Sequence, residues 1–377
     1  MTDRAVQPFT INVPQADLDD LRDRLGRTRW PDALPDVGWR YGAPLSYIKE
    51  LADYWQSSYD WRKHEALLNS YDHFTTTIDG ANVHFMHVRS PHDNAIPLLM
   101  THGWPGSIVE FLDVIEPLTN PDDDGDAFHL VMPSIPGYGF SGPTNDTGWD
   151  HVRVARAFVQ LMSELGYERY GVQGGDWGAA VSRDIATLDP DHVIGAHINM
   201  FGTRAPADAS DLTDEERRRV DRAQLFQRDG WGYGWIQGTR PQTLSYGLTD
   251  SPVGQLAWIA EKFKEWTDSE DLPEDAVDRD RLLTNISIYW FTRTAGSSAR
   301  LYYETFHAGS GLGAEQSKVP LGVAVFPREI APAIRRFADE KEPIVHWSEF
   351  DRGGHFAAME EPDLFVGDVR EFFRRFR

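Results

Sequence analysis

The sequence predicts an α/β protein whose central sheet is mostly parallel and covered by helices on both faces. From about residue 75 to residue 199, short strand-like segments alternate with amphipathic helices, which is typical of a parallel sheet. The alternation stops near residue 203, and a helical, charged and aromatic stretch continues to about residue 305. Strand signals then return before a C-terminal helix. We therefore expect a sheet-based core with a helical cap inserted into it.

The segment before the sheet is rich in Trp and Arg and is expected to be helical. Leu18, Leu21 and Leu25 share one face of a helix over residues 16–25, and the turn signals at 27–32 end it. A second helix is expected over residues 45–59.

Runs of apolar and β-branched residues between turn signals predict the strands. They cover residues 75–78, 83–88, 97–101, 130–132, 170–173, 193–199, 319–326 and 344–347. Ser107 and Glu110 have the spacing of a capping box for a helix over residues 108–118, and Asp150 begins a helix that ends at Gly166. The last helix begins at Pro362, and its apolar face is expected to carry Phe365, Val369, Phe372 and Phe376.

Composition excludes several classes of protein. A chain of 377 residues with 41% hydrophobic residues is globular, and a net charge of −22 disfavours nucleic acid and anionic membranes as partners. Without cysteine there is no disulfide, cysteine metal site or thiol chemistry. No apolar run approaches the roughly 18 residues of a membrane helix, so we expect a soluble, cytoplasmic protein. The acidic turn at 121–126 is expected to be a solvated loop, because a calcium loop would need a different ligand spacing.

Residues 174–178, Gly-Gly-Asp-Trp-Gly, resemble a nucleophile elbow with aspartate where an esterase carries serine. The small residues two before and two after Asp176 fit the tight turn, and the flanking segments predict a strand and then a helix in which Ala180, Ile185 and Leu188 are apolar. A serine that attacked a saturated carbon would leave an inert ether, whereas a carboxylate leaves an ester that water can cleave. The elbow therefore predicts displacement at a saturated carbon, as in an epoxide or an alkyl halide.

Partners for Asp176 follow later strands in the chain order of an α/β-hydrolase, which is nucleophile, acid, histidine. His355 follows the last strand and is the expected general base. Glu329 follows the strand before it and could orient the imidazole, with Asp351 as a competing acid. The loop at 102–107 is expected to donate the Trp104 N–H to an oxyanion hole, together with the N–H of Trp177. Whether the peptide bond between Trp104 and Pro105 is cis or trans is left open by the sequence. His102 is expected to pack and shape this loop.

These strings together resemble the microsomal-type epoxide hydrolases of the α/β-hydrolase superfamily over essentially the whole chain. The matching segments are 27–31, 71–78, 102–107, 174–178, 326–329 and 353–362. The resemblance implies an N-terminal meander over residues 1–90 that wraps around core and cap, a first core part over 91–202, a cap over 203–305 and a second core part over 306–377. Membrane-bound members carry an anchor helix that this sequence does not show, which adds to the expectation of a soluble protein.

The resemblance also implies two cap tyrosines, Tyr233 and Tyr302, that hydrogen-bond the epoxide oxygen, with Tyr303 and Tyr246 as rivals. An alkoxide leaving group needs such acids, whereas a halide does not. The expected activity is hydrolysis of an apolar or aromatic epoxide, such as a biosynthetic intermediate, to a vicinal diol. No cofactor or metal is expected, and the expected partners are the epoxide substrate and water. The sequence does not decide whether the protein forms a homodimer. A haloalkane dehalogenase is the main alternative, and a catalytically dead binding module is another.

Overall fold

The computed structural model describes residues 6–121, 126–203, 205–206, 209, 211–309, 316–338 and 342–377. Nine strands of these residues form one sheet in the order β1-β2-β3-β5-β4-β6-β7-β8-β9. Their bounds are β1 Gln7–Phe9, β2 His73–Ile78, β3 Ala81–Val88, β4 Ile96–Thr101, β5 Phe128–Pro133, β6 Tyr170–Gly174, β7 Val193–Ile198, β8 Leu321–Val325 and β9 Ile344–Glu349. Most of the acidic turn at 121–126 lies outside the described residues.

The sheet is parallel from β5 through β9, because β4 pairs in parallel with β5 and β6, and β6, β7, β8 and β9 continue the same direction. The pairs β1 with β2, β2 with β3 and β3 with β5 are antiparallel. The predicted strands and their mostly parallel arrangement are confirmed, and the short strand β1 is an addition that the sequence did not suggest.

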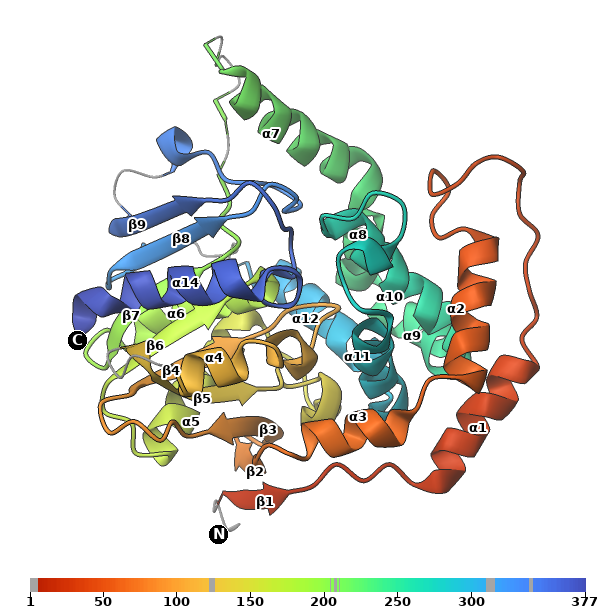
Figure 1. Cartoon of the computed structure of the whole chain (residues 1–377), viewed down its shortest axis with the longest axis horizontal. Helices are drawn as coiled ribbons and strands as arrows, with labels where there is room; N and C mark the ends of the chain where they lie inside the picture. Colours follow the sequence, from red (N-terminus) through yellow and green to blue (C-terminus); the bar gives the residue numbers. More distant parts are fainter. Residues whose placement is uncertain are drawn as a thin grey trace.

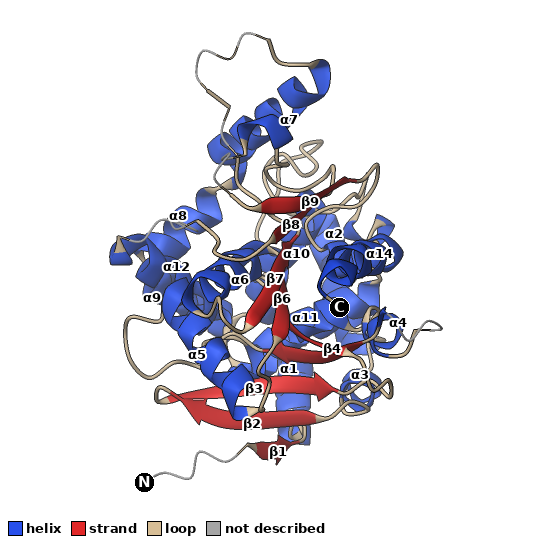
Figure 2. Ribbon diagram, turned by 90° about the vertical axis from the view of Figure 1, so that its left-hand side faces the viewer, coloured by secondary structure: helices blue, strands red, loops and turns tan. Residues whose placement is uncertain are grey.

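Helices cover both faces of the sheet (Figure 2). One face carries α5 His151–Glu164 and α6 Asp176–Leu188, and the other carries α4 Ile115–Thr119 and α14 Pro362–Phe373. Gly195 on β7 and Gly322 on β8 make room for the ring of Phe372, since a Cβ at either position would lie within about 3 Å of that ring. As predicted, Asp150 caps α5 by accepting the N–H of Arg153.

A helical layer stands beyond the carboxyl ends of the parallel strands (Figure 1). It comprises α7 Asp214–Leu225, α8 Gly232–Thr239, α9 Pro241–Asp250, α10 Pro252–Trp266, α11 Arg279–Thr292 and α12 Ala295–Ala308. The N-terminal helices α1 Gln15–Gly26, α2 Leu45–Ser57 and α3 Trp61–Leu68 pack against this layer. For example, the indole N–H of Trp55 donates to Ser287 on α11 at 3.0 Å.

One local prediction is wrong. The single helix expected over 108–118 is a 3₁₀ turn, Ile108–Phe111, followed by the short helix α4. Pro117 explains the break, because a continuous helix would need its missing N–H. Ser107 still caps the first turn by accepting the N–H of Val109, but the carboxylate of Glu110 turns toward Gly106. Leu188, one of the apolar positions of the predicted helix, is 41% exposed at the end of α6.

The described helices include none that is both long and apolar enough to cross a membrane. The division at residues 90, 202 and 305 stays a prediction.

Candidate active site

Asp176 occupies a strained turn between β6 and α6, as the elbow pattern predicts. Its φ is +48°, in the left-handed region that a residue with a side chain seldom adopts. A Cβ on Gly174 would lie 2.1 Å from the carbonyl oxygen of Gly178, and one on Gly178 would lie 1.8 Å from that of Thr101. Only glycine fits at these two positions. The glycines two residues before and two residues after Asp176 are therefore required by close backbone contacts in the structure.

The two oxygens of the Asp176 carboxylate have different neighbours. Oδ1 accepts the backbone N–H of Trp104 at 2.8 Å, and Oδ2 lies 3.4 Å from Nε2 of His355. Trp104 lies in the loop after β4, and its bond to Pro105 is cis. Trp177 is the second residue of α6, and N–H groups in the first turn of a helix have no partner within that helix.

His355 and Glu329 meet at the carboxyl ends of β8 and β9, where the predicted order places them. Nδ1 of His355 lies 2.7 Å from Oε1 of Glu329, and both side chains are buried. Burial acts to lower the pKa of His355, but the charges of Glu329 and Asp176 and hydrogen bonds to both hold that pKa well above its ordinary value. The side chain of the rival acid, Asp351, is 92% exposed. The structure therefore places Glu329, and not Asp351, beside the imidazole.

Two backbone contacts fix the loops that carry this pair. The N–H of His355 donates to the carbonyl of Trp266 at the end of α10, and the N–H of Ile330 donates to Glu329 Oε1 at 2.6 Å. The helical layer, through α10, therefore contacts the loop that carries His355 directly.

Tyr233 on α8 and Tyr302 on α12 line the same cavity as Asp176, with their rings 5.8 Å apart. The indole of Trp104 stacks on Tyr233 at 4.9 Å, and that of Trp177 meets Tyr302 edge-on at 4.7 Å. Burial raises the pKa of each tyrosine well above its ordinary value, and the charge of Asp176 adds to the effect. Both phenols therefore stay protonated and can donate hydrogen bonds.

The rival tyrosines lie elsewhere. Tyr246 is 72% exposed on α9, and Tyr303 stacks on His307 at 4.0 Å, one residue along α12 from the inward-facing position. His102 packs beneath the loop, as expected: its Nδ1 lies 2.9 Å from the carbonyl of Gly103, and burial lowers its pKa to about 4.

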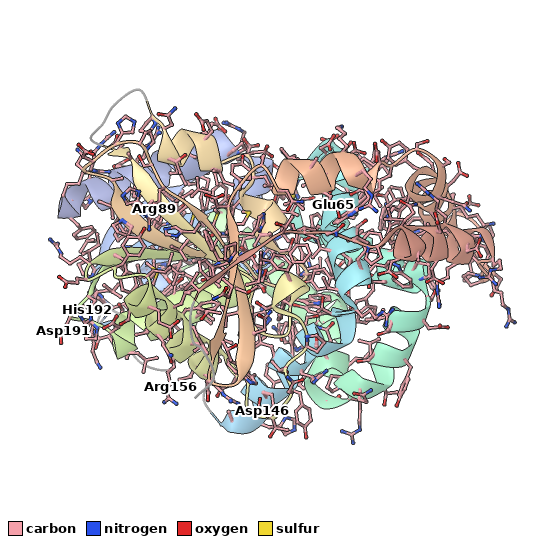
Figure 3. All side chains as sticks on the ribbon, turned by 90° about the horizontal axis from the view of Figure 1, so that it is seen from below. Glu65, Arg89, Asp146, Arg156, Asp191 and His192 are labelled. Carbon is pink, nitrogen blue, oxygen red and sulfur yellow. The ribbon has the colours of Figure 1, made fainter. Side chains whose placement is uncertain are left out.

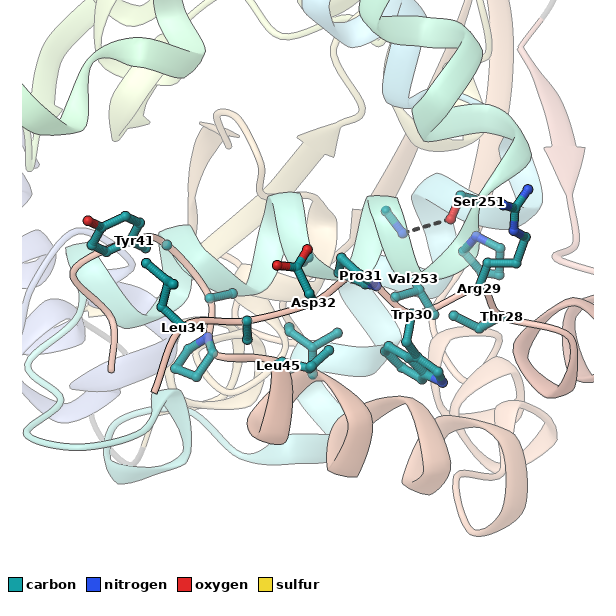
Figure 4. A pocket seen from close by; sticks show the side chains of 18 of the residues that line it. Thr28, Arg29, Trp30, Pro31, Asp32, Leu34, Tyr41, Leu45, Ser251 and Val253 are labelled. Atoms are coloured by element: carbon teal, nitrogen blue, oxygen red, sulfur yellow. Dashed lines mark hydrogen bonds between the residues drawn. The ribbon is translucent and has the colours of Figure 1, made fainter. Parts of the chain in front are cut away.

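The cavity above Asp176 has a volume of about 390 Å³, within the range of small-molecule sites. Apolar side chains make up most of its lining: Trp177, Ala179, Ala180, Met200, Phe201, Phe226, Trp231, Ile330 and Ala331. A larger cavity of about 960 Å³ lies between the N-terminal segment and α10 (Figure 4), but it contains none of the predicted site residues. Within the described residues, no group of three or more acidic, histidine or cysteine side chains is arranged to hold a metal ion.

The structure adds three groups that the sequence did not assign to the site. The buried ammonium of Lys262 lies 4.9 Å from the centre of the Tyr233 ring. Burial raises the pKa of Glu110, behind the Trp104 loop, to about 8. Burial also raises the pKa of Glu360 to about 8, and its carboxylate accepts the N–H of Phe356 beside the histidine. No local pattern marks Lys262 on its helix, whereas Glu360 stands within the matching segment 353–362.

Comparison with known proteins agrees with this geometry. Residues 6–111 match the family model of the epoxide hydrolase N terminus, and residues 96–253 match that of the alpha/beta hydrolase fold. A candidate epoxide hydrolase of Stigmatella aurantiaca is 48% identical over 99% of this chain and 86% of its own length. Epoxide hydrolase 1 of Sus scrofa is 38% identical over 98% of this chain and 89% of its own length. The chain belongs to the epoxide hydrolase family.

Solved structures of the family show the same architecture. The crystal structure of juvenile hormone epoxide hydrolase from the silkworm Bombyx mori has a TM-score of 0.91 at 34% identity, and the match covers 99% of this chain and 95% of that one. The predicted α/β-hydrolase fold and the microsomal type of epoxide hydrolase are thus confirmed. The comparisons do not favour a haloalkane dehalogenase.

Proposed function

We propose that this epoxide hydrolase opens its substrate by forming a covalent ester on Asp176 and then releases a vicinal diol. The observation that carries the proposal is that the two oxygens of the Asp176 carboxylate have different neighbours. Oδ1 is held by the Trp104 N–H at 2.8 Å, whereas Oδ2 lies 3.4 Å from Nε2 of His355, and Asp176 lines the cavity that also contains the two tyrosines. One oxygen can therefore attack while the other is already bound by an oxyanion donor.

In the first step, Oδ2 of Asp176 attacks an epoxide carbon from the side opposite the breaking C–O bond. The electron pair of that bond moves onto the epoxide oxygen, which receives hydrogen bonds from Tyr233 and Tyr302 and then takes a proton from one of them. Because both phenols are protonated in their buried setting, they can act as soon as the alkoxide develops. The product is a hydroxyalkyl ester of Asp176.

In the second step, Nε2 of His355 takes a proton from water, and the resulting hydroxide attacks Cγ of the ester. Glu329 orients the imidazole through Nδ1. The negative charge that develops on Oδ1 is stabilised by the Trp104 N–H and, we propose, by the Trp177 N–H. The bond between Cγ and Oδ2 then breaks as protonated His355 gives its proton to Oδ2, so the diol leaves with the original carboxylate oxygen and the water oxygen remains in Asp176. The proton left on the Asp176 carboxyl group returns to the tyrosinate formed in the first step, which restores the free enzyme.

The lining of the cavity favours an apolar or aromatic epoxide, and a biosynthetic intermediate of this kind is the proposed substrate class. A cytoplasmic location and a homodimer stay predictions, which cell fractionation and light scattering would check.

Product analysis tests the activity itself. Styrene oxide and primary chloro- and bromoalkanes would be incubated with the wild-type enzyme, and diol and halide would be measured separately. We expect diol from the epoxide and no halide release above background. Halide release at a rate matching or exceeding diol formation would instead assign the chain to haloalkane dehalogenation.

A further inference from the structure

The cavity that holds Asp176 continues along one face of α6 to an arginine. Asp176, Ala180 and Arg183 all line the cavity, and their spacing of four and seven residues places them on one side of the helix. Seven residues correspond to roughly 10 Å of helix axis at 1.5 Å per residue. Arg183 therefore lies about two helical turns from the nucleophile along the wall of the same mostly apolar cavity.

Arg183 is the one cationic side chain among the described residues that line this cavity. Its guanidinium carbon lies 5.3 Å from the centre of the Phe201 ring, and its side chain is 14% exposed. Nη2 donates to Oε1 of Glu342 at 2.5 Å, whereas the buried Nε finds no acceptor among the described residues. A guanidinium has five N–H donors, and buried donors are rarely left without acceptors. The remaining donors make this part of the cavity suited to an oxygen atom of the substrate.

We propose that Arg183 binds a neutral carbonyl oxygen at the far end of an elongated epoxide substrate. This inference rests on the proposed function, because it requires the epoxide end of the same molecule to reach Asp176. It adds a second polar group, placed about two helical turns from the epoxide, to the apolar substrate class.

The charge of the ligand follows from Glu342. The side chain of Glu342 is 7% exposed and pairs with Arg183, so the pair supplies N–H donors without net positive charge. A substrate carboxylate would place a further negative charge near Asp176 and Glu342 in a poorly solvated site, which is unfavourable. A ketone or amide oxygen accepts the same hydrogen bonds without that cost.

Three series of terminal epoxides test this subsite. Their alkyl chains would vary in length and end in a methyl ketone, in the isopropenyl group that replaces the carbonyl oxygen by a CH₂ group, or in a carboxylate. The readout is kcat/KM for diol formation, compared between ketone and isopropenyl partners of equal length. At the best length, we expect wild type to prefer the ketone by roughly tenfold or more, as expected for a hydrogen bond to a charged donor.

Variants of Arg183 and Glu342 test whether this pair causes the preference for the ketone. Arg183→Met should reduce the ratio between ketone and isopropenyl substrates to about one, and so should the double variant Arg183→Met/Glu342→Gln, which leaves no unpaired buried charge. Glu342→Gln alone leaves Arg183 cationic and should raise kcat/KM for the carboxylate series by roughly tenfold or more. Arg156→Met is the matched control, because Arg156 is exposed on the neighbouring helix α5 (Figure 3) and should leave every ratio unchanged.

Two results would overturn the subsite: equal kcat/KM for ketone and isopropenyl substrates at every chain length in wild type, or a ketone preference that survives in Arg183→Met. The wild-type comparison decides the matter even where a variant does not fold. If wild type forms diol from styrene oxide but shows no ketone preference, the subsite fails and the proposed function stands. If neither styrene oxide nor any member of the series gives diol, the proposed function itself fails.

Discussion

Nε2 of His355 lies 3.4 Å from Oδ2 of Asp176, so the base of the second step contacts the nucleophile of the first. The charge of Asp176 is one reason why the pKa of His355 is raised in the free enzyme. Alkylation converts Asp176 into a neutral ester and removes that contribution. The pKa of His355 should therefore fall when the intermediate forms, and the imidazole becomes a free base when the mechanism needs one.

This coupling predicts how the two steps depend on pH. A protonated His355 cannot accept a proton from water, so ester hydrolysis should slow as the pH falls through the pKa that His355 has in the alkyl-enzyme. Ring opening does not use His355 as a base, so alkylation of Asp176 should slow less than ester hydrolysis does. Rapid-quench mass spectrometry across the acidic range should show the alkyl-enzyme accumulating as kcat decreases. A decrease in kcat without any accumulation would contradict the assignment.

His355→Gln should trap the same intermediate at neutral pH. Glutamine can fill much of the space of the imidazole but cannot act as a base, so ring opening proceeds and hydrolysis stops. The intact mass of the variant, measured after mixing with substrate, should rise by the mass of one epoxide. His307→Gln, a change at an exposed histidine of α12, is the control and should turn over without a stable adduct. Normal turnover by His355→Gln would rule out this base.

Glu329 should affect the pKa of His355 and the rate of ester hydrolysis, and Asp351 should affect neither. Glu329→Gln removes the charge that contributes most to raising the pKa of His355, so that pKa should fall. Ester hydrolysis should slow by on the order of 10²-fold, because a neutral amide no longer stabilises the imidazolium and its NH₂ group can hold the imidazole in the wrong tautomer. Asp351→Asn changes an exposed side chain and should alter neither quantity. NMR titration of the histidine and single-turnover kinetics would measure both, and a larger effect of Asp351→Asn would reverse the assignment of the acid.

The tyrosines should act on ring opening alone. Tyr233→Phe and Tyr302→Phe should each slow formation of the alkyl-enzyme by roughly 10²–10⁴-fold, the usual range of acid catalysis, and the double variant should nearly eliminate it. Ester hydrolysis should change much less. Tyr246→Phe and Tyr303→Phe serve as controls, because neither tyrosine lines the cavity. Pre-steady-state kinetics with styrene oxide separates the two steps, and full activity of the Tyr233/Tyr302 double variant would remove the tyrosines from the mechanism.

Much of the core could be predicted from the sequence because its signals are local. The elbow glycines report close backbone contacts, and the strand pattern places Glu329 and His355 at the same edge of a parallel sheet as Asp176. The chemistry of an aspartate nucleophile then follows from the residue type. The resemblance to the family supplied Tyr233 and Tyr302, which helical spacing alone does not distinguish from Tyr303 or Tyr246.

Other features depend on packing between distant segments, and the sequence alone could not supply them. The contact between Trp266 and His355 joins the end of α10 to the loop after β9. The pairing of Arg183 with Glu342 joins two segments that are separated in the sequence by helices α7 to α12. Pro117, in contrast, is a local signal in the sequence, because proline disrupts the interior of a helix. The prediction of one helix over 108–118 did not take it into account.

The covalent ester on Asp176 is the central claim, and a single turnover in oxygen-labelled water tests it most directly. With enzyme in excess over styrene oxide, hydroxide attack on Cγ should put the label into the Asp176 carboxylate, and the first diol should be unlabelled. Digestion and peptide mass spectrometry would locate the label, and Asp176→Asn should form neither adduct nor diol, because an amide is a very weak nucleophile. Full incorporation of label into the first-turnover diol, with none in Asp176, would show that water attacks the epoxide directly and would contradict the mechanism.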